Sequence, residues 1–147
     1  MPTYRVHTAI AAPPEQVFAA IADLTRHSAW AADPLEISAV SPGPIAVGSR
    51  YRSTAQAQGR TITAELEVTE LQPPQRFAFS VRDLTGNYRH QFSVQPTAGG
   101  SHVERVISAA LSLPQALLFY AVFLIIKRPN TRKGLERLKT LLESQSG

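Results

Sequence analysis

The sequence predicts an α+β domain in which a seven-stranded antiparallel sheet curls around one long C-terminal helix. Three observations carry this prediction: a strand followed by two short helices at the N-terminus, apolar residues that alternate with a period of two from Ser49 to about Leu111, and a helical period after Pro114. A strongly twisted sheet with one apolar face needs a cover, and the C-terminal helix is long enough to provide it.

Length and composition indicate an ordinary globular protein. The chain has 147 residues, so we expect residues 1–147 to form a single domain. Hydrophobic residues make up 44% and charged residues 18%, which disfavours extensive disorder. The absence of cysteine excludes a disulfide framework, a thiolate metal site and a cysteine nucleophile. The N-terminus lacks the basic start and apolar run of a signal peptide, so we expect a cytoplasmic protein.

The basic character of the chain is confined to one stretch. Fifteen basic and 11 acidic residues give a net charge of +4. Between residues 127 and 139 six basic residues face one acid, which gives this stretch +5 and leaves −1 for the rest of the chain. A globally basic protein would indicate nucleic acid, whereas here one basic stripe lies on an otherwise near-neutral chain, so nucleic acid is not expected as a partner. The residues concerned are Lys127, Arg128, Arg132, Lys133, Glu136, Arg137 and Lys139.

The elements before the long alternating region are short. Residues 3–10 have strand-like composition, and Pro13 and Pro14 then end the strand and open a helix, because proline suits a first helical turn. A second short helix is expected over residues 24–30, and a strand over 35–39. The apolar face of the first helix consists of Val17, Phe18 and Ile21.

The alternating region predicts a meander with one buried face and one wet face. Turns are expected at residues 72–75, 85–87 and 98–100, where proline, glycine and asparagine gather. Polar residues such as Thr63, Glu65 and Gln91 occupy the outer face. The residues predicted to face the long helix are Ile62, Leu66, Phe77, Phe79, Tyr88, Phe92 and Val103.

The C-terminal helix is expected to end near Ser144 and to be kinked or split at Pro129. Residues 117–126 are apolar all round, but they are too few for the roughly 20 residues that cross a bilayer. We expect their uncovered side to form an exposed patch for a homodimer contact, a partner, or shallow docking on an anionic membrane. The patch would include Leu117, Leu118, Tyr120 and Ile125 or their neighbours, and the membrane would contact Arg132, Lys133 and Arg137.

Several short motifs occur in a characteristic order: residues 12–18, Asp23 followed by Trp30, Gly48 with Ser49, then 68–77, 100–103 and 138–143. With these motifs the chain resembles the START-like superfamily, also called SRPBCC, and within it the polyketide cyclase/dehydrase-like group. The resemblance covers essentially the whole chain. It implies a helix-grip fold with an apolar cavity between sheet and helix. Members bind lipids, sterols, polyketides or plant hormones, some cyclise aromatic polyketides, and others bind coenzyme Q or act as toxin-like partner proteins.

Two residues on the predicted inner face are candidates for catalysis or ligand binding. His90 is in phase with Tyr88 and Phe92, so it is either a general acid or base in the cavity or a core histidine bonded to a hydroxyl or carbonyl. Arg105 falls in the apolar phase of the last strand. It either holds a ligand carboxylate or enolate, pairs with an internal acid, or is turned outward by a bulge.

The leading hypothesis is therefore that the protein binds a small hydrophobic molecule such as a lipid, quinone or polyketide, with transport of that molecule as a further use. The alternatives are a polyketide cyclase or dehydratase, with His90, Tyr88 and Arg105 as its candidate catalytic residues, and a peripheral membrane or partner-docking protein. No metal is expected, because His7, His27 and His102 lack metal-site spacing, and no phosphate or dinucleotide motif indicates a cofactor. The predicted cavity lining is Trp30, Tyr51, Tyr88, His90, Arg105, Phe119 and Phe123.

Overall fold

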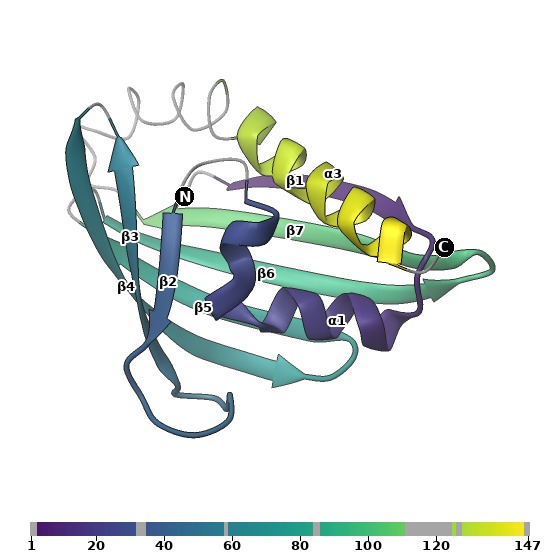
Figure 1. The fold of residues 1–147 in the computed structure, drawn as a ribbon, viewed down its shortest axis with the longest axis horizontal. Coiled ribbons are helices and arrows are strands. Elements are labelled where there is room, and N and C mark those ends of the chain that lie inside the picture. Colours follow the sequence, from purple (N-terminus) through teal and green to yellow (C-terminus); the bar gives the residue numbers. More distant parts are fainter. Residues whose placement is uncertain are drawn as a thin grey trace.

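The computed structural model describes residues 3–31, 35–57, 59–83, 86–110, 125 and 128–145. In this part of the chain seven antiparallel strands form one sheet, and helical elements lie against one of its faces (Figure 1). The strands are β1 Thr3–Ile10, β2 Leu35–Ala39, β3 Arg50–Ala57, β4 Arg60–Gln72, β5 Arg76–Asp83, β6 Gly86–Thr97 and β7 Gly100–Ala110. The helical elements are α1 Pro14–Ala22, the 3-10 helix η1 Leu24–Ala29 and α3 Arg128–Gln145.

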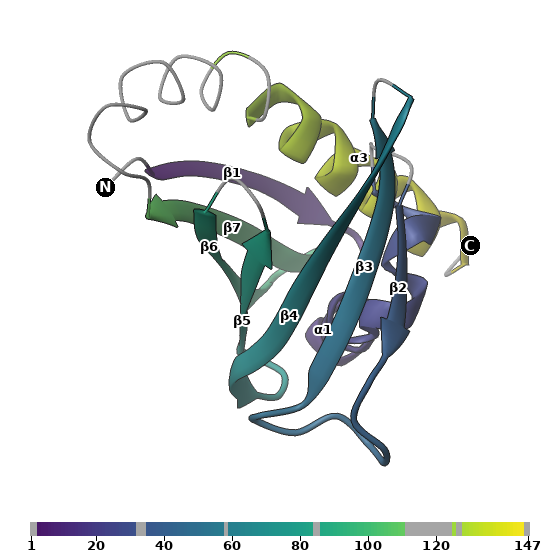
Figure 2. The same ribbon diagram turned by 90° about the vertical axis from the view of Figure 1, so that its left-hand side faces the viewer.

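The sheet has the strand order β1-β7-β6-β5-β4-β3-β2, so six consecutive strands form a meander and β1 pairs with its last strand. Figure 2 shows the sheet bending, with the helices on the enclosed side. On that side α3 contacts β1, α1 contacts β6 and β7, and η1 contacts β2. The predicted seven-stranded helix-grip arrangement is confirmed, and the two short helices share the cover with the C-terminal helix.

The predicted inner face is largely the buried face of the sheet. Leu66, Phe77, Phe79, Phe92 and Val103 are buried, and Tyr88 is half-buried. The polar residues between them, such as Thr63 and Glu65, are exposed. Alternation along the strands therefore predicts the buried face of β4 to β7 correctly, although a bulge between Val68 and Glu70 shifts the register of β4 against β5.

Ile62 is the exception in this set, since 38% of its surface is exposed. It pairs with Ala55, close to the turn between β3 and β4. Its side chain follows the inward phase of Ala64 and Leu66 but is less buried than either of them. Ile62 therefore has the predicted inward phase, but unlike the rest of the set it is not covered.

The two short helices form where proline and apolar spacing place them. Pro14 is the first residue of α1, and the predicted apolar residues Val17, Phe18 and Ile21 are all buried. The second predicted helix is a single 3-10 helix, η1, rather than an α-helix. Its first residue, Leu24, is buried, so it is anchored by an apolar side chain.

The C-terminal helix α3 packs through a one-sided apolar stripe. Pro129 lies in its first turn, where a missing backbone N–H costs nothing. Leu135, Leu138 and Leu142 are buried, and Leu141 is half-buried. Most of the apolar segment 117–126 lies outside the described residues, so its predicted patch stays a prediction. Ile125, its one described member, is 72% exposed. Within the described ranges no helix has the length and apolarity to span a membrane.

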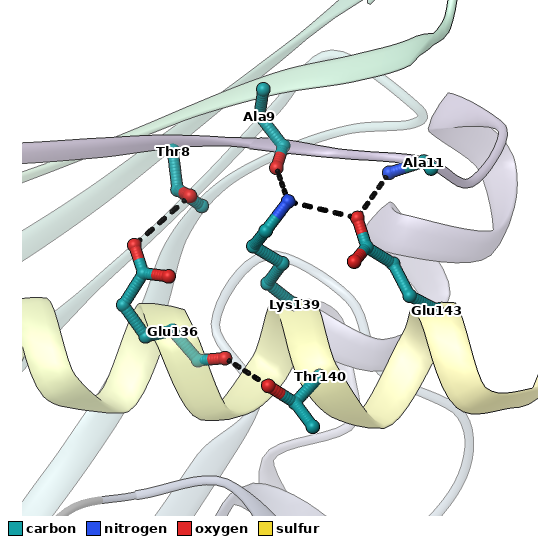
Figure 3. Close-up of polar contacts among 7 residues, drawn as sticks. All are labelled: Thr8, Ala9, Ala11, Glu136, Lys139, Thr140 and Glu143. Atoms are coloured by element: carbon teal, nitrogen blue, oxygen red, sulfur yellow. Dashed lines mark hydrogen bonds and ion pairs between the residues drawn. The ribbon is translucent and has the colours of Figure 1, made fainter.

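A row of polar contacts fixes α3 along β1, which is the edge strand of the sheet (Figure 3). The Lys139 ammonium donates a hydrogen bond to the backbone carbonyl of Ala9 at 2.7 Å and pairs with the Glu143 carboxylate at 2.9 Å. Glu143 also accepts the Ala11 N–H at 2.9 Å. This N–H bond, followed by Lys139, lowers the pKa of Glu143. The helix thus satisfies backbone groups that an edge strand otherwise exposes.

Replacing Lys139 should loosen this attachment. We expect Lys139→Met to lower the free energy of unfolding by about 1 kcal/mol, because one charged hydrogen bond to a backbone carbonyl is lost at a partly exposed site. Lys133→Met, on the exposed side of the same helix, should change it by less than about 0.5 kcal/mol. Urea unfolding followed by circular dichroism measures both. Equal stabilities for the two variants would contradict this role of Lys139.

Candidate functional site

The predicted site residues His90 and Arg105 meet on the inner face of the sheet. In the register of β6 and β7, Phe92 pairs with Arg105 and His90 pairs with Ile107, so His90 and Arg105 are diagonal neighbours. Arg105 Nη2 donates a hydrogen bond to His90 Nδ1 at 2.8 Å. The prediction that Arg105 points inward is confirmed. The bulge alternative is wrong, because β7 pairs without interruption with both neighbours around Arg105.

Arg105 is surrounded by rings rather than by acids. Only 6% of its surface is exposed, and its Cζ lies 4.8 Å from the centroid of Phe92 and 5.8 Å from the ring of Trp30. These are cation–π distances. No carboxylate in the described ranges lies within ion-pairing distance of its guanidinium. The neighbouring Glu104 lies on the other face, where it pairs with Arg5 at 3.3 Å.

Sequence reasoning missed His27, which the fold adds to this group. His27 is 6% exposed on η1, and its ring centroid lies 4.2 Å from that of Trp30. Its spacing from Leu24 was the available signal, since residues three apart lie on the same side of a 3-10 helix. Sequence alone does not show, however, against which part of the sheet that side packs. We call His27, Trp30, His90 and Arg105 the inner cluster.

Three buried nitrogens of the inner cluster have no hydrogen-bond partner among the described residues. They are Nδ1 of His27, Nε1 of Trp30 and Nε of Arg105. A buried polar atom without a partner costs about 1–3 kcal/mol, and most such atoms in folded proteins are paired. Three of them in one group of contacting side chains therefore indicate a place where polar atoms of another molecule are received.

The electrostatics of the inner cluster are those of one cation among neutral rings. Burial, and then the charge of Arg105, lower the pKa of His27 to about 3. Burial, Arg105 and His27 hold the pKa of His90 well below its usual range. Burial also lowers the pKa of Arg105 to about 10, so it stays charged at neutral pH. Because His90 Nδ1 accepts from Arg105, the proton of its neutral ring lies on Nε2.

These lowered pKa values predict a loss of stability in mild acid. The unfolded state takes up a proton on His27 near pH 6.5 and the folded state only near pH 3, so stability is complete above pH 6.5 and falls as pH drops between these values. We expect the wild-type protein to lose about 2 kcal/mol through His27 alone between pH 7.5 and pH 5. In His27→Leu the loss should be smaller by this amount, with the part due to His90 remaining, whereas in the exposed control His7→Leu the full loss should remain. A His27→Leu variant with the wild-type pH dependence in urea unfolding would refute the neutral, buried imidazole.

The remaining predicted lining residues are less closely grouped. Tyr88 is half-buried and is the next residue before His90 on the inner face of β6. Tyr51 is 9% exposed on β3, and β4 and β5 separate its strand from β6. Burial, followed by the charge of Asp23, raises the pKa of Tyr51. Phe119 and Phe123 lie outside the described residues.

Two hollows on the described surface lie away from the inner cluster. One of about 380 Å³ is formed at the start of α3, and one of about 510 Å³ lies on the outer face of the sheet. Neither is lined by a member of the inner cluster. In the described ranges no three His, Asp or Glu side chains come together as metal ligands. The inner cluster offers N–H donors and one positive charge, which is the chemistry of a site for an electron-rich oxygen.

Comparison with solved structures supports the fold. The structure of StfQ, a di-domain ARO/CYC from the steffimycin biosynthetic pathway, matches with a TM-score of 0.82 and 10% sequence identity over 99% of this chain and 52% of StfQ. TTHA0849 from Thermus thermophilus matches with a TM-score of 0.77 and 21% identity over 99% of this chain and all of that one. CV1439 from Chromobacterium violaceum matches with a TM-score of 0.72 and 21% identity over 97% and 99% of the two chains. No curated protein matches significantly.

A family model described as polyketide cyclase/dehydrase and lipid transport matches residues 1–143. The match spans every strand and nearly all of α3, so it includes the inner cluster and the elements that hold it. It agrees with the resemblance inferred from the short motifs and with the helix-grip arrangement of sheet and helices. The chain belongs to the polyketide cyclase/dehydrase and lipid transport family.

Proposed function

We propose that this protein binds a small hydrophobic molecule, of the lipid, quinone or polyketide kind, against the inner face of its sheet. The observation that carries the proposal is the inner cluster, in which three buried nitrogens, one of them Nε of the cation Arg105, have no hydrogen-bond partner among the described residues on an otherwise apolar face. A hydrophobic ligand with a polar end satisfies both halves of this environment: its body contacts the apolar side chains, and its polar atoms meet the unpaired nitrogens.

Catalysis by the same residues has less support. A general base works best when its pKa lies near the working pH, and the pKa of His90 is held well below that range. Its Nδ1 is occupied by the Arg105 hydrogen bond as well. A cyclase or dehydratase would therefore have to use His90 as a donor through Nε2 or rely on Arg105 for charge stabilisation. Ligand binding requires neither proton donation by His90 nor stabilisation of a reaction intermediate by Arg105.

The chain offers a built-in reporter for ligand binding. Trp30 is its only tryptophan and belongs to the inner cluster. We expect titration with the neutral dye N-phenyl-1-naphthylamine to quench Trp30 emission in a saturable way at one site per chain. The dye is uncharged, so the titration tests hydrophobic binding independently of ligand charge. Native mass spectrometry of the freshly purified protein should in addition detect a bound small molecule.

Two histidine variants complete the test. His90→Ala should reduce the free energy of dye binding by more than it reduces the free energy of unfolding, because it removes the ring that binds Arg105 in the inner cluster. His102→Ala is the matched control, since His102 lies on the outer face of β7 against His7. Absence of saturable quenching, together with a ligand-free mass spectrum, would refute binding at this face. Loss of stability in His90→Ala with unchanged dye affinity of the folded protein would make His90 a core residue.

A further inference from the structure

Arg105 is a buried cation for which the described structure provides no anion. Burying a charge is costly unless an opposite charge compensates it. Ten of the 11 acidic side chains lie in the described ranges, and none of the ten is within ion-pairing distance of Arg105. The acids closest to its strand are engaged elsewhere, as Glu104 pairs with Arg5 and Glu143 with Lys139. The stretch 111–127 contains no Asp or Glu in its sequence, so it supplies no acidic partner either.

The unpaired nitrogens define what the missing partner must offer. Arg105 Nε and Trp30 Nε1 carry hydrogens and no lone pair, so each needs an acceptor. His90 provides an acceptor to Arg105 Nη2 but no charge, since its ring is neutral. An anionic oxygen accepts several hydrogen bonds at once and neutralises the guanidinium. A neutral carbonyl or hydroxyl oxygen would satisfy the donors but would leave the buried charge uncompensated.

The surroundings of the donors define the rest of the ligand. Phe79 stacks on the His90 ring at 4.9 Å, Phe92 lies under Arg105, and Ile107 is the strand neighbour of His90. The polar part of the site is therefore one small spot on an apolar surface. A multiply charged or strongly polar molecule would bury groups that find no partner there.

We infer that the ligand of this site is an amphipathic monoanion, whose anionic oxygen binds to Arg105 and Trp30 while its apolar body lies along the inner face. This inference rests on the proposed function and makes it specific. The anionic oxygen belongs either to a carboxylate, as in a fatty acid, or to an acidic enol, as in a hydroxyquinone or polyketide. Both share the chemistry that Arg105 requires.

Two matched pairs of probes test the inference at pH 7.5, with displacement of N-phenyl-1-naphthylamine as the readout. Laurate is compared with dodecan-1-ol, and 2-hydroxy-1,4-naphthoquinone with 2-methyl-1,4-naphthoquinone. We expect the acid to bind at least ten times more tightly than its neutral counterpart in one pair, and that pair identifies the carboxylate or the enolate source. Arg105→Met should abolish the preference, and Arg105→Lys should retain part of it because the charge remains.

Arg89→Met is the control for net charge. Arg89 precedes His90 on β6 but lies exposed on the outer face, so its loss should leave the preference intact. Equal affinity for acid and neutral probes, or failure of all four to displace the dye, would overturn the inference and leave hydrophobic binding standing, whereas absence of dye binding together with a ligand-free mass spectrum would refute both. Asp33, which lies outside the described residues, is tested by Asp33→Asn. If this variant loses stability only when Arg105 is present, Asp33 is the counter-ion and the inference is wrong.

Discussion

Gly100→Ala is expected to lower the free energy of unfolding by about 3–5 kcal/mol, because the added methyl group would collide with backbone atoms. A Cβ on Gly100 would overlap the Ile10 carbonyl oxygen and lie 2.8 Å from the Ala12 nitrogen. The φ of Gly100 is +149°, in the region that favours glycine. Neither contact is relieved by rotating a side chain, since both partners are backbone. The start of β7 and the link between β1 and α1 would have to separate.

The adjacent Gly99 is the matched control for this prediction. A Cβ at Gly99 meets no atom within 4 Å, so Gly99→Ala should change stability by less than about 1 kcal/mol. Ser101 strengthens the same junction, as its buried hydroxyl donates to the Ala12 carbonyl at 2.7 Å. Guanidinium unfolding of both variants gives the comparison. Similar midpoints for Gly99→Ala and Gly100→Ala would show that the close approach of the two segments is not required.

Phe77→Ala is expected to be equally severe, with a loss of about 3–5 kcal/mol. Phe77 is fully buried on β5, and its ring lies 5.6–6.3 Å from those of Phe18, Phe79 and Phe92. Truncation removes a large apolar surface and leaves a cavity between α1 and the sheet. Because Phe92 also lies under Arg105, we expect the inner cluster to be disturbed as well.

Ile62→Ala provides the contrast for Phe77→Ala. Both side chains belong to the inward phase that alternation predicts, but Ile62 is 38% exposed near the end of its hairpin. Its truncation should cost less than about 1 kcal/mol, because much of the side chain is already in contact with water. Urea denaturation curves of both variants measure the difference. A loss at Ile62 comparable to that at Phe77 would mean that the hairpin end is covered.

The fold was predictable because its signals are local or repeat along the chain. Pro14 marks the start of α1, and the alternation from Leu66 to Val103 assigns the faces of four strands. Alternation assigns a face, however, and not the extent of what covers it. The exposure of Ile62 follows from this limit, since the periodic pattern continues past the edge of the covered area.

The site was predictable only in part, and the reason is again physical. His90 and Arg105 were placed on the inner face by their phase, but their contact depends on the register of β6 against β7, which the turn at Ala98 and Gly99 determines. His27 enters the inner cluster through the packing of η1; its spacing from Leu24 indicates a shared side of this helix, but not the part of the fold against which that side packs. The absence of a described acid beside Arg105 is likewise a property of the folded chain.

The most direct test of a ligand-binding role for the inner cluster is urea unfolding of Arg105→Met, with and without laurate. Burying an arginine without a counter-ion destabilises the folded state. The free energy of unfolding of the ligand-free variant should therefore lie within about 1 kcal/mol of that of the wild type, or above it. Laurate should raise the unfolding midpoint of the wild type by more than that of the variant, because the variant keeps the apolar face but loses the charge that binds the carboxylate. A loss of about 3–5 kcal/mol in the ligand-free variant, with the same response to laurate as the wild type, would show that Arg105 serves the fold and not a ligand.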